Sequence, residues 1–198
     1  MRGAHMTSTP NIIHRGAEGT TFIPIDDAYL RERLVFLLGE INDEAAATFC
    51  KEVMYLSKTQ EPVKVYIFSG GGSVTAGKAI YDIMQCCGVE VHTYCIGVAA
   101  SMAAILLAAG TKGHRYILPH SEVMIHEVLM PGGVGGTATN IRKISQSINA
   151  TRTVMNGILA KHTGKTIEEI DEATSYDHFM TPEEAIEFGI CDQIIDKL

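Results

Sequence analysis

The sequence predicts an α/β domain with a largely parallel sheet, because short β-rich runs alternate with amphipathic helical runs along the chain. With 198 residues, the chain is long enough for one domain with a full hydrophobic core. Hydrophobic residues make up 46% and charged residues 20%, a balance typical of a packed globular protein. We expect one domain over residues 21–198, preceded by a leader and a mobile N-terminal arm over residues 1–20.

Charge and composition disfavour several classes of function. The formal net charge is -7 and the basic residues are scattered, so nucleic acid is not an expected ligand. The most apolar run, residues 98–109, is shorter than the roughly 20 residues of a membrane-spanning helix, so no membrane association is expected. No export signal is recognisable, and the five cysteines lack C-x-x-C spacing, which favours reduced thiols and a cytoplasmic location.

The first half of the chain alternates strand and helix after an irregular beginning. Residues 7–24 mix Gly, Thr and Pro without periodicity, which predicts an irregular or mobile arm. Asn42 or Asp43 is placed to cap the first long helix. The pattern then predicts a strand over 34–38, a helix reaching Ser57, a strand over 63–68, a glycine turn over 69–72, a helix over 73–87 and a strand over 89–96.

The second half continues with a helix of small residues over 101–109 and strands over 115–118 and 123–128. A glycine-rich stretch over 131–136 precedes a long helix near 138–162. That helix would be roughly 37 Å long, which is longer than a small domain needs for its own core, so we expect its apolar stripe to pack against another subunit. Thr181, Pro182 and Glu184 form the signature of a last short helix that Gly189 ends.

Acyl transfer by a serine requires a nucleophile, a base, a group that orients the base, and N–H donors for the oxyanion. Ser101 is a candidate nucleophile, since it follows a strand through small residues and precedes an apolar helix. The backbone N–H groups of Met102, in the first helical turn, and of Gly72, at the end of another strand, are candidate oxyanion donors. Taken alone, Ser101 also fits a simple helix N-cap.

The other two candidate groups have equally ordinary alternatives. His126 lies on the strand predicted over 123–128 and could be a satisfied, half-buried histidine. Asp177 lies between two predicted helices and could be a loop or capping carboxylate. None of these residues establishes a function by itself.

Two competing motifs are incomplete. Residues 72–79 nearly match a phosphate-binding loop, but Ala79 lacks the hydroxyl that binds Mg²⁺ in that motif. No histidine pair has H-E-x-x-H spacing, and the cysteines have no ligand spacing, so neither a metal nor another cofactor is expected.

Several segments, in order, resemble the proteolytic subunit family of the Clp protease (ClpP). These segments are GGSVTAG at 71–77, AASMA at 99–103 and VMIH at 123–126, and the likeness runs from about Leu34 to the C-terminus. The resemblance implies an α/β ClpP/crotonase-like domain of repeated β-β-α and βαβ units. It also implies a protruding helix-and-strand handle at about 129–162.

The resemblance also assigns roles. It makes Ser101 the nucleophile, His126 the general base and Asp177 the orienting acid of a serine endopeptidase, with the N–H groups of Gly72 and Met102 as the oxyanion hole. It implies heptameric rings stacked as a tetradecamer, into which an AAA+ unfoldase that uses ATP delivers unfolded polypeptides. Four residues would contribute to the pockets where the unfoldase docks: Tyr66, Tyr116, Leu118 and Ile195.

The sequence departs from the family pattern at several positions. Gly70 stands where the family has proline, Val98 where it has glutamine, and Glu127 follows the histidine in place of glutamine. Further departures are Lys64 at a docking position, and Ser175 and Tyr176 where an Asp-Arg pair often bridges the rings. These differences suggest a divergent paralogue, and a paralogue of this kind could work in a mixed complex with a second subunit type. The alternatives are a weakly active or structural ring subunit of a mixed complex, and a crotonase-type acyl-CoA enzyme.

Overall fold

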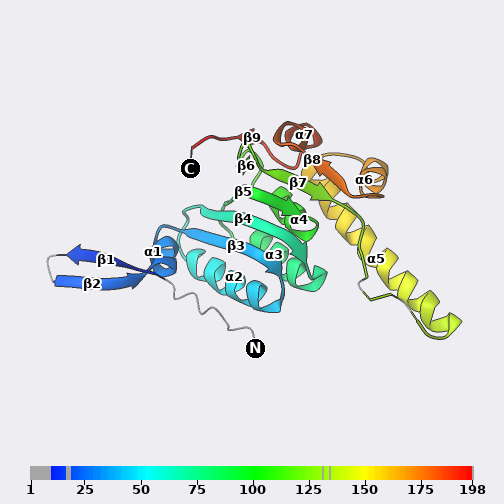
Figure 1. Cartoon of the computed structure of the whole chain (residues 1–198), viewed down its shortest axis with the longest axis horizontal. Helices are drawn as coiled ribbons and strands as arrows, with labels where there is room; N and C mark the ends of the chain where they lie inside the picture. Colours follow the sequence, from blue (N-terminus) through cyan, green and yellow to red (C-terminus); the bar gives the residue numbers. More distant parts are fainter. Residues whose placement is uncertain (1–9, 17–18, 131, 134, 198) are drawn as a thin grey trace, which may run out of the picture.

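A seven-stranded sheet forms the framework of the computed structural model, which describes residues 10–16, 19–130, 132–133 and 135–197. Five strands lie in the order β3-β4-β5-β6-β9 and pair in parallel, and β7 pairs in parallel with β5 and antiparallel with β8 (Figure 1). The strands are β3 (Leu34–Ile41), β4 (Val63–Gly72), β5 (Val91–Ala100), β6 (Arg115–Ile117), β7 (Glu122–Ile125), β8 (His178–Met180) and β9 (Gln193–Ile194). The predicted α/β fold with a largely parallel sheet is confirmed.

Three helices that follow strands bury one face of this sheet. They are α2 (Asp43–Leu56), α3 (Val74–Cys86) and α4 (Met102–Ala108). Alternate strand residues such as Val35, Val65 and Ile67 share a core with Phe49 of α2 and Leu106 of α4. The predicted cap of α2 is confirmed, because the Asn42 side chain accepts a hydrogen bond from the Ala45 N–H at 2.9 Å.

Strand β5 pairs with two different strands along the same edge. Its first half pairs with β6 through residues 93–95, and its second half pairs with β7 through residues 98–100. Between the two halves lies Gly97, whose φ of 77° is in the left-handed region and whose N–H donates to the Ser121 hydroxyl at 2.8 Å. This bend lets β5 continue past β6, so that its carboxyl end lies beside β7.

The expectation of an irregular N-terminal arm is wrong for the described residues 11–16 and 19–24. Strands β1 (Asn11–Gly16) and β2 (Gly19–Pro24) form an antiparallel hairpin that projects from the body, followed by α1 (Ile25–Arg31) (Figure 1). This hairpin is held by backbone pairing between its two strands and has no continuous buried face. Its sequence therefore lacks the alternation of apolar and polar residues from which a strand is predicted. Residues 1–6, the expected leader, lie outside the described residues.

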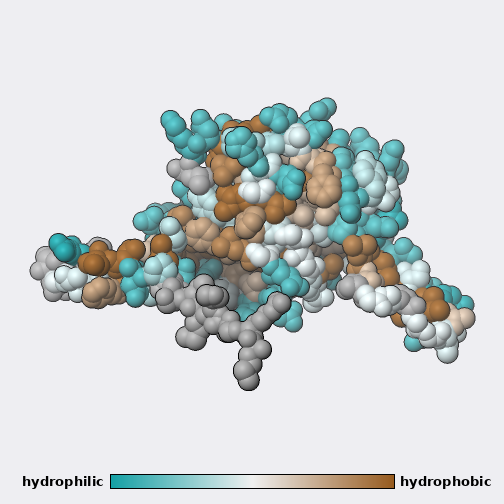
Figure 2. Space-filling model, viewed as in Figure 1, coloured by the Kyte–Doolittle hydropathy of each residue, from teal (hydrophilic) through white to brown (hydrophobic). Residues whose placement is uncertain are grey.

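The hairpin and the long helix carry apolar side chains into solvent (Figure 2). Phe22 on β2 is 67% exposed. Helix α5 (Ala138–Thr163) extends away from the sheet at its N-terminal end (Figure 1), where Ile141 is exposed. Its other half packs on the core of the same chain, because Met155 and Leu159 are buried. Part of the apolar stripe of α5 therefore packs within the chain, and the expected packing of this helix against another subunit stays a prediction.

The remaining helices are α6 (Ile167–Ala173) and α7 (Pro182–Phe188). The predicted start of α7 is confirmed: the Thr181 hydroxyl accepts from the Glu184 N–H, and the Glu184 carboxylate accepts from the Thr181 N–H. Helix α6 begins with the same reciprocal pattern at Thr166 and Glu169 and was not predicted. Among the described residues, no helix combines the length and apolarity that crossing a bilayer requires.

Candidate active site

Ser101 occupies a tight turn between the end of β5 and the start of α4. Its φ of 55° and ψ of −123° lie in a region that residues with a Cβ rarely adopt. The Ser101 N–H donates to the Met124 carbonyl at 2.7 Å, which ties the turn to β7. The Ser101 side chain makes no hydrogen bond to the helix backbone, so the simple N-cap alternative is wrong.

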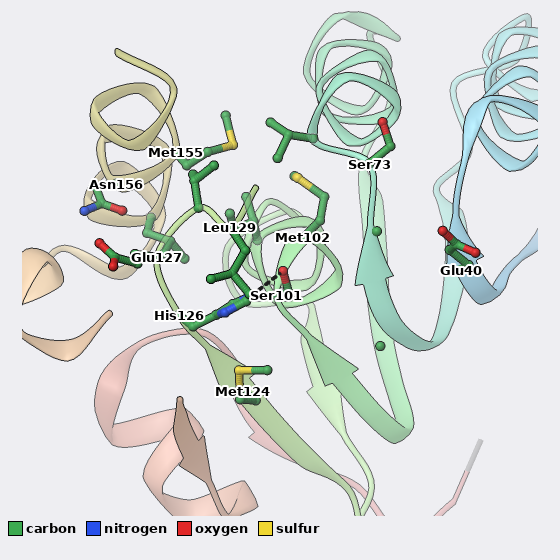
Figure 3. Close-up of a pocket in the computed structure, with 16 residues that line it drawn as sticks. Glu40, Ser73, Ser101, Met102, Met124, His126, Glu127, Leu129, Met155 and Asn156 are labelled. Atoms are coloured by element: carbon green, nitrogen blue, oxygen red, sulfur yellow. Dashed lines mark hydrogen bonds between the residues drawn. The ribbon is translucent and has the colours of Figure 1, made fainter. Parts of the chain in front are cut away.

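The hydroxyl of Ser101 instead contacts His126. The distance between Ser101 Oγ and His126 Nε2 is 2.8 Å, well within hydrogen-bonding range (Figure 3). His126 follows the last residue of β7, so the strand predicted over 123–128 ends three residues earlier than expected. The imidazole is largely buried, with 13% of the side chain exposed.

Strand pairing also brings Asp177 to this histidine. In the antiparallel pair of β7 and β8, Ile125 lies opposite His178, so the next pair along the register is His126 and Asp177. Asp177 Oδ1 lies 3.5 Å from His126 Nδ1, beyond the usual hydrogen-bond length, and 66% of the Asp177 side chain is exposed. Asp177 lies between two helices, as predicted, and directly precedes β8, a strand that was not predicted.

Ser101 and His126 line a cavity of about 580 Å³. Its walls come from β3, β4, the start of α3, α4, β7 with the segment after it, and α5, and they are mainly apolar (Figure 3). The apolar lining consists of Val74, Met102, Ile105, Met124, Val128, Leu129, Met155 and Leu159. The contribution of α5 was not predicted, although the helical spacing of Met155 and Leu159 was recognised as an apolar stripe. Such a cavity has room for an extended, partly apolar chain segment beside the serine.

The two candidate oxyanion donors lie at the same cavity. Gly72 and Met102 both line it, and Met102 is the first residue of α4, where a backbone N–H has no acceptor within the helix. Gly71, which was not singled out from the sequence, makes this approach possible. A Cβ on Gly71 would lie 2.8 Å from Ser101 Cβ and 3.1 Å from Met102 N. The glycines thus let β4 pass directly against the serine turn.

Glu127, which stands where the family pattern has glutamine, lines the cavity and pairs with a cationic side chain, Arg152. Its carboxylate lies 3.8 Å from Nε of Arg152 on α5, and Arg152 also lies 3.4 Å from Asp171 on α6. Asp171 in turn accepts a hydrogen bond from Asn156. This network connects the segment after His126 with α5 and α6.

The four expected docking residues lie away from this cavity, on the sheet face that the helices leave open. Tyr66 and Tyr116 flank Tyr94, and their ring centroids lie 4.7 and 4.8 Å, respectively, from the ring centroid of Tyr94. By register, Leu118 and Ile195 continue the same face beyond β6 and β9. Burial raises the pKa of Tyr94 to about 12, with further contributions from the two neighbouring tyrosines. The row is one surface, and its function as a docking site stays a prediction.

The segment that resembles a phosphate-binding loop uses its backbone differently. The Ser73 N–H donates to the Ile41 carbonyl, and the Gly77 N–H donates to the Ser73 carbonyl. The Ser73 hydroxyl caps α3 through the Ala76 N–H. These amides are therefore occupied within the fold, which supports the structural explanation of the match.

Gly71→Ala tests how closely β4 approaches the serine turn. We expect a loss of about 1–3 kcal/mol in stability, because the φ of Gly71 is 94° and its new Cβ would overlap Ser101 Cβ. Thermal unfolding measures the loss. Gly70→Ala is the matched control, since a Cβ there meets nothing within 4 Å. Equal stability of the two variants would contradict the observed packing.

Comparison with known families agrees with this architecture. Residues 17–198 match the family model described as Clp protease. The match includes both strands that lead to the glycine and serine turns, the histidine after β7, and the carboxylate before β8. It covers far more than half of the chain, including all the described residues that line the cavity. The chain therefore belongs to the Clp protease family.

Proposed function

We propose that the protein is a serine-type endopeptidase subunit that hydrolyses peptide bonds of unfolded polypeptides. The observation that carries this proposal is the 2.8 Å contact between Ser101 Oγ and His126 Nε2, made by a serine held in a strained turn. Membership of the Clp protease family agrees with peptidase chemistry.

In the proposed mechanism, His126 takes the hydroxyl proton as Ser101 attacks the carbonyl carbon of the peptide bond. The N–H groups of Gly72 and Met102 stabilise the negative charge that develops on the carbonyl oxygen. His126 then gives its proton to the leaving amine, which departs and leaves an acyl group on Ser101. A water molecule, activated by the same imidazole, hydrolyses this ester and restores the serine. Asp177 holds the imidazole orientation and stabilises its protonated form.

We further propose that subunits assemble into stacked heptameric rings that receive substrate from an AAA+ unfoldase. Exposed apolar side chains on the β1–β2 hairpin, the α5 arm and the open sheet face support an assembly that covers them. Tyr66, Tyr116, Leu118 and Ile195 are the proposed unfoldase-docking residues. A second subunit type remains part of this proposal because Ser175 and Tyr176 replace the usual ring-bridging pair.

Two other functions make different demands on the same residues. A crotonase-type enzyme would use the backbone donors without a nucleophilic serine, and the Ser101–His126 contact favours the peptidase over it. A structural ring subunit would keep the fold with an inactive triad, and the long contact and exposure of Asp177 are the features that favour it.

A fluorophosphonate probe distinguishes these functions. We expect the assembled protein to be labelled at Ser101, because the probe requires a serine activated by a neighbouring base. Ser101→Ala should abolish labelling and lower peptide hydrolysis by at least about 10⁴-fold. Mass spectrometry locates the label, and a fluorogenic peptide reports hydrolysis. An assembled ring that is neither labelled nor active would contradict the peptidase proposal and favour a structural subunit.

Asp177→Asn tests whether the loose carboxylate takes part in catalysis. We expect kcat to fall by about 10²–10⁴-fold, because an amide no longer stabilises the protonated imidazole. The control is Asp82→Asn on the exposed side of α3, which should leave kcat unchanged. Unchanged kcat in Asp177→Asn would show that another group orients His126.

A further inference from the structure

A second cluster of ionisable side chains lies at the opposite end of β5 from Ser101. Among the residues that the structure describes, Glu90, His92 and His114 each offer a ligand atom, and these atoms lie within 4.8 Å of one another. The ten residues of β5, at about 3.3 Å each, separate this cluster from the serine turn by about 30 Å. The cluster is therefore independent of the catalytic residues.

The backbone holds the two histidines side by side. Thr93 on β5 pairs with Arg115 on β6, so His92 on β5 lies beside His114, the residue immediately before β6. The Thr93 N–H donates to the His114 carbonyl at 3.0 Å, which fixes this register. Because both histidines precede the paired residues by one position, their side chains lie on the same face of the sheet. The arrangement is set by the sheet and not by a mobile loop.

The His92 side chain already contacts both of the other side chains. The two imidazole rings stack with centroids 4.0 Å apart and planes within 5°. Glu90 Oε2 lies 2.9 Å from His92 Nε2, and this hydrogen bond lowers the pKa of the Glu90 carboxyl. Ligand atoms around a tetrahedral Zn²⁺ lie about 3.3–3.5 Å apart, so the three groups are near coordination distance, and the stacked rings would rotate out of parallel to direct both ring nitrogens at one ion.

A fourth residue can orient one of the ligands. His114 Nδ1 lies 3.0 Å from the Tyr116 hydroxyl. When Nδ1–H donates to that oxygen, Nε2 of the neutral ring keeps its lone pair for a metal ion, as in many protein zinc sites. Lys64 lies beside His92 in register, but its side chain is exposed and extends into solvent. The local arrangement therefore supplies three ligands and an orienting partner.

We propose that Glu90, His92 and His114 bind one divalent transition-metal ion of the Zn²⁺ class. Two imidazoles and one carboxylate suit Zn²⁺, and a fourth position would be open to water. The ion would connect the beginnings of β5 and β6 and, through His114, hold Tyr116 in the tyrosine row. This proposal departs from the sequence-based expectation that no metal binds, which rested on local ligand spacing.

Titration of the chelator-treated, full-length protein with Zn²⁺ tests the proposal by calorimetry. We expect one tight site per chain, a Kd at least about tenfold weaker in His92→Gln and in His114→Gln, and about tenfold weaker binding in Tyr116→Phe. Zn²⁺ should also raise the unfolding temperature of the unmodified protein, and this shift should be lost in His92→Gln.

Two histidine variants serve as controls. His120→Gln changes an exposed histidine outside the cluster, and His126→Gln removes the catalytic imidazole as a competing ligand. Both should keep the tight site. Circular dichroism without metal checks that each variant folds. Glu90→Gln removes a ligand from a side chain that is 55% exposed, so it replaces any histidine variant that does not fold. Absence of saturable binding, or unchanged Kd in His92→Gln and His114→Gln, would overturn the proposal.

Discussion

The parallel pairing of β5 with β7 is the constraint on which the candidate active site depends. The Ser101 N–H donates to the Met124 carbonyl, and His126 follows two residues later. A one-residue slip in this register would turn the side chains to opposite faces and separate the hydroxyl from the imidazole. Gly97 is essential to the arrangement, because its bend frees the second half of β5 from β6 and makes it available to β7.

Burial divides the triad into two parts with different structural support. Ser101 and His126 rest on the sheet and on α4, and both line the same cavity. Asp177 depends on the three-residue strand β8 and on a largely exposed loop position. The position of Asp177 relative to His126 therefore depends most on the neighbouring elements. Among these are α5 and α6, because Arg152 on α5 pairs both with Glu127 after the histidine and with Asp171 on α6.

Local signals predicted much of this fold. The caps at Asn42 and Thr181 are short-range hydrogen bonds between neighbouring residues, so the sequence contains all the information they need. Strands β8 and β9 have three and two residues and exist only because other strands pair with them. The proximity of Gly71 to Ser101, and of His92 to His114, arises from sheet register between distant segments. Composition and periodicity do not report such contacts.

The most direct test is a crystal structure of the assembled protein after reaction with a peptide boronic acid. We expect a covalent bond from boron to Ser101 Oγ, with a boronate oxygen about 2.7–3.1 Å from the backbone nitrogens of Gly72 and Met102. We also expect Asp177 to approach His126 Nδ1 to hydrogen-bond distance, about 2.6–3.2 Å. An unmodified Ser101, or a boronate oxygen directed away from both nitrogens, would contradict the proposed serine-peptidase site.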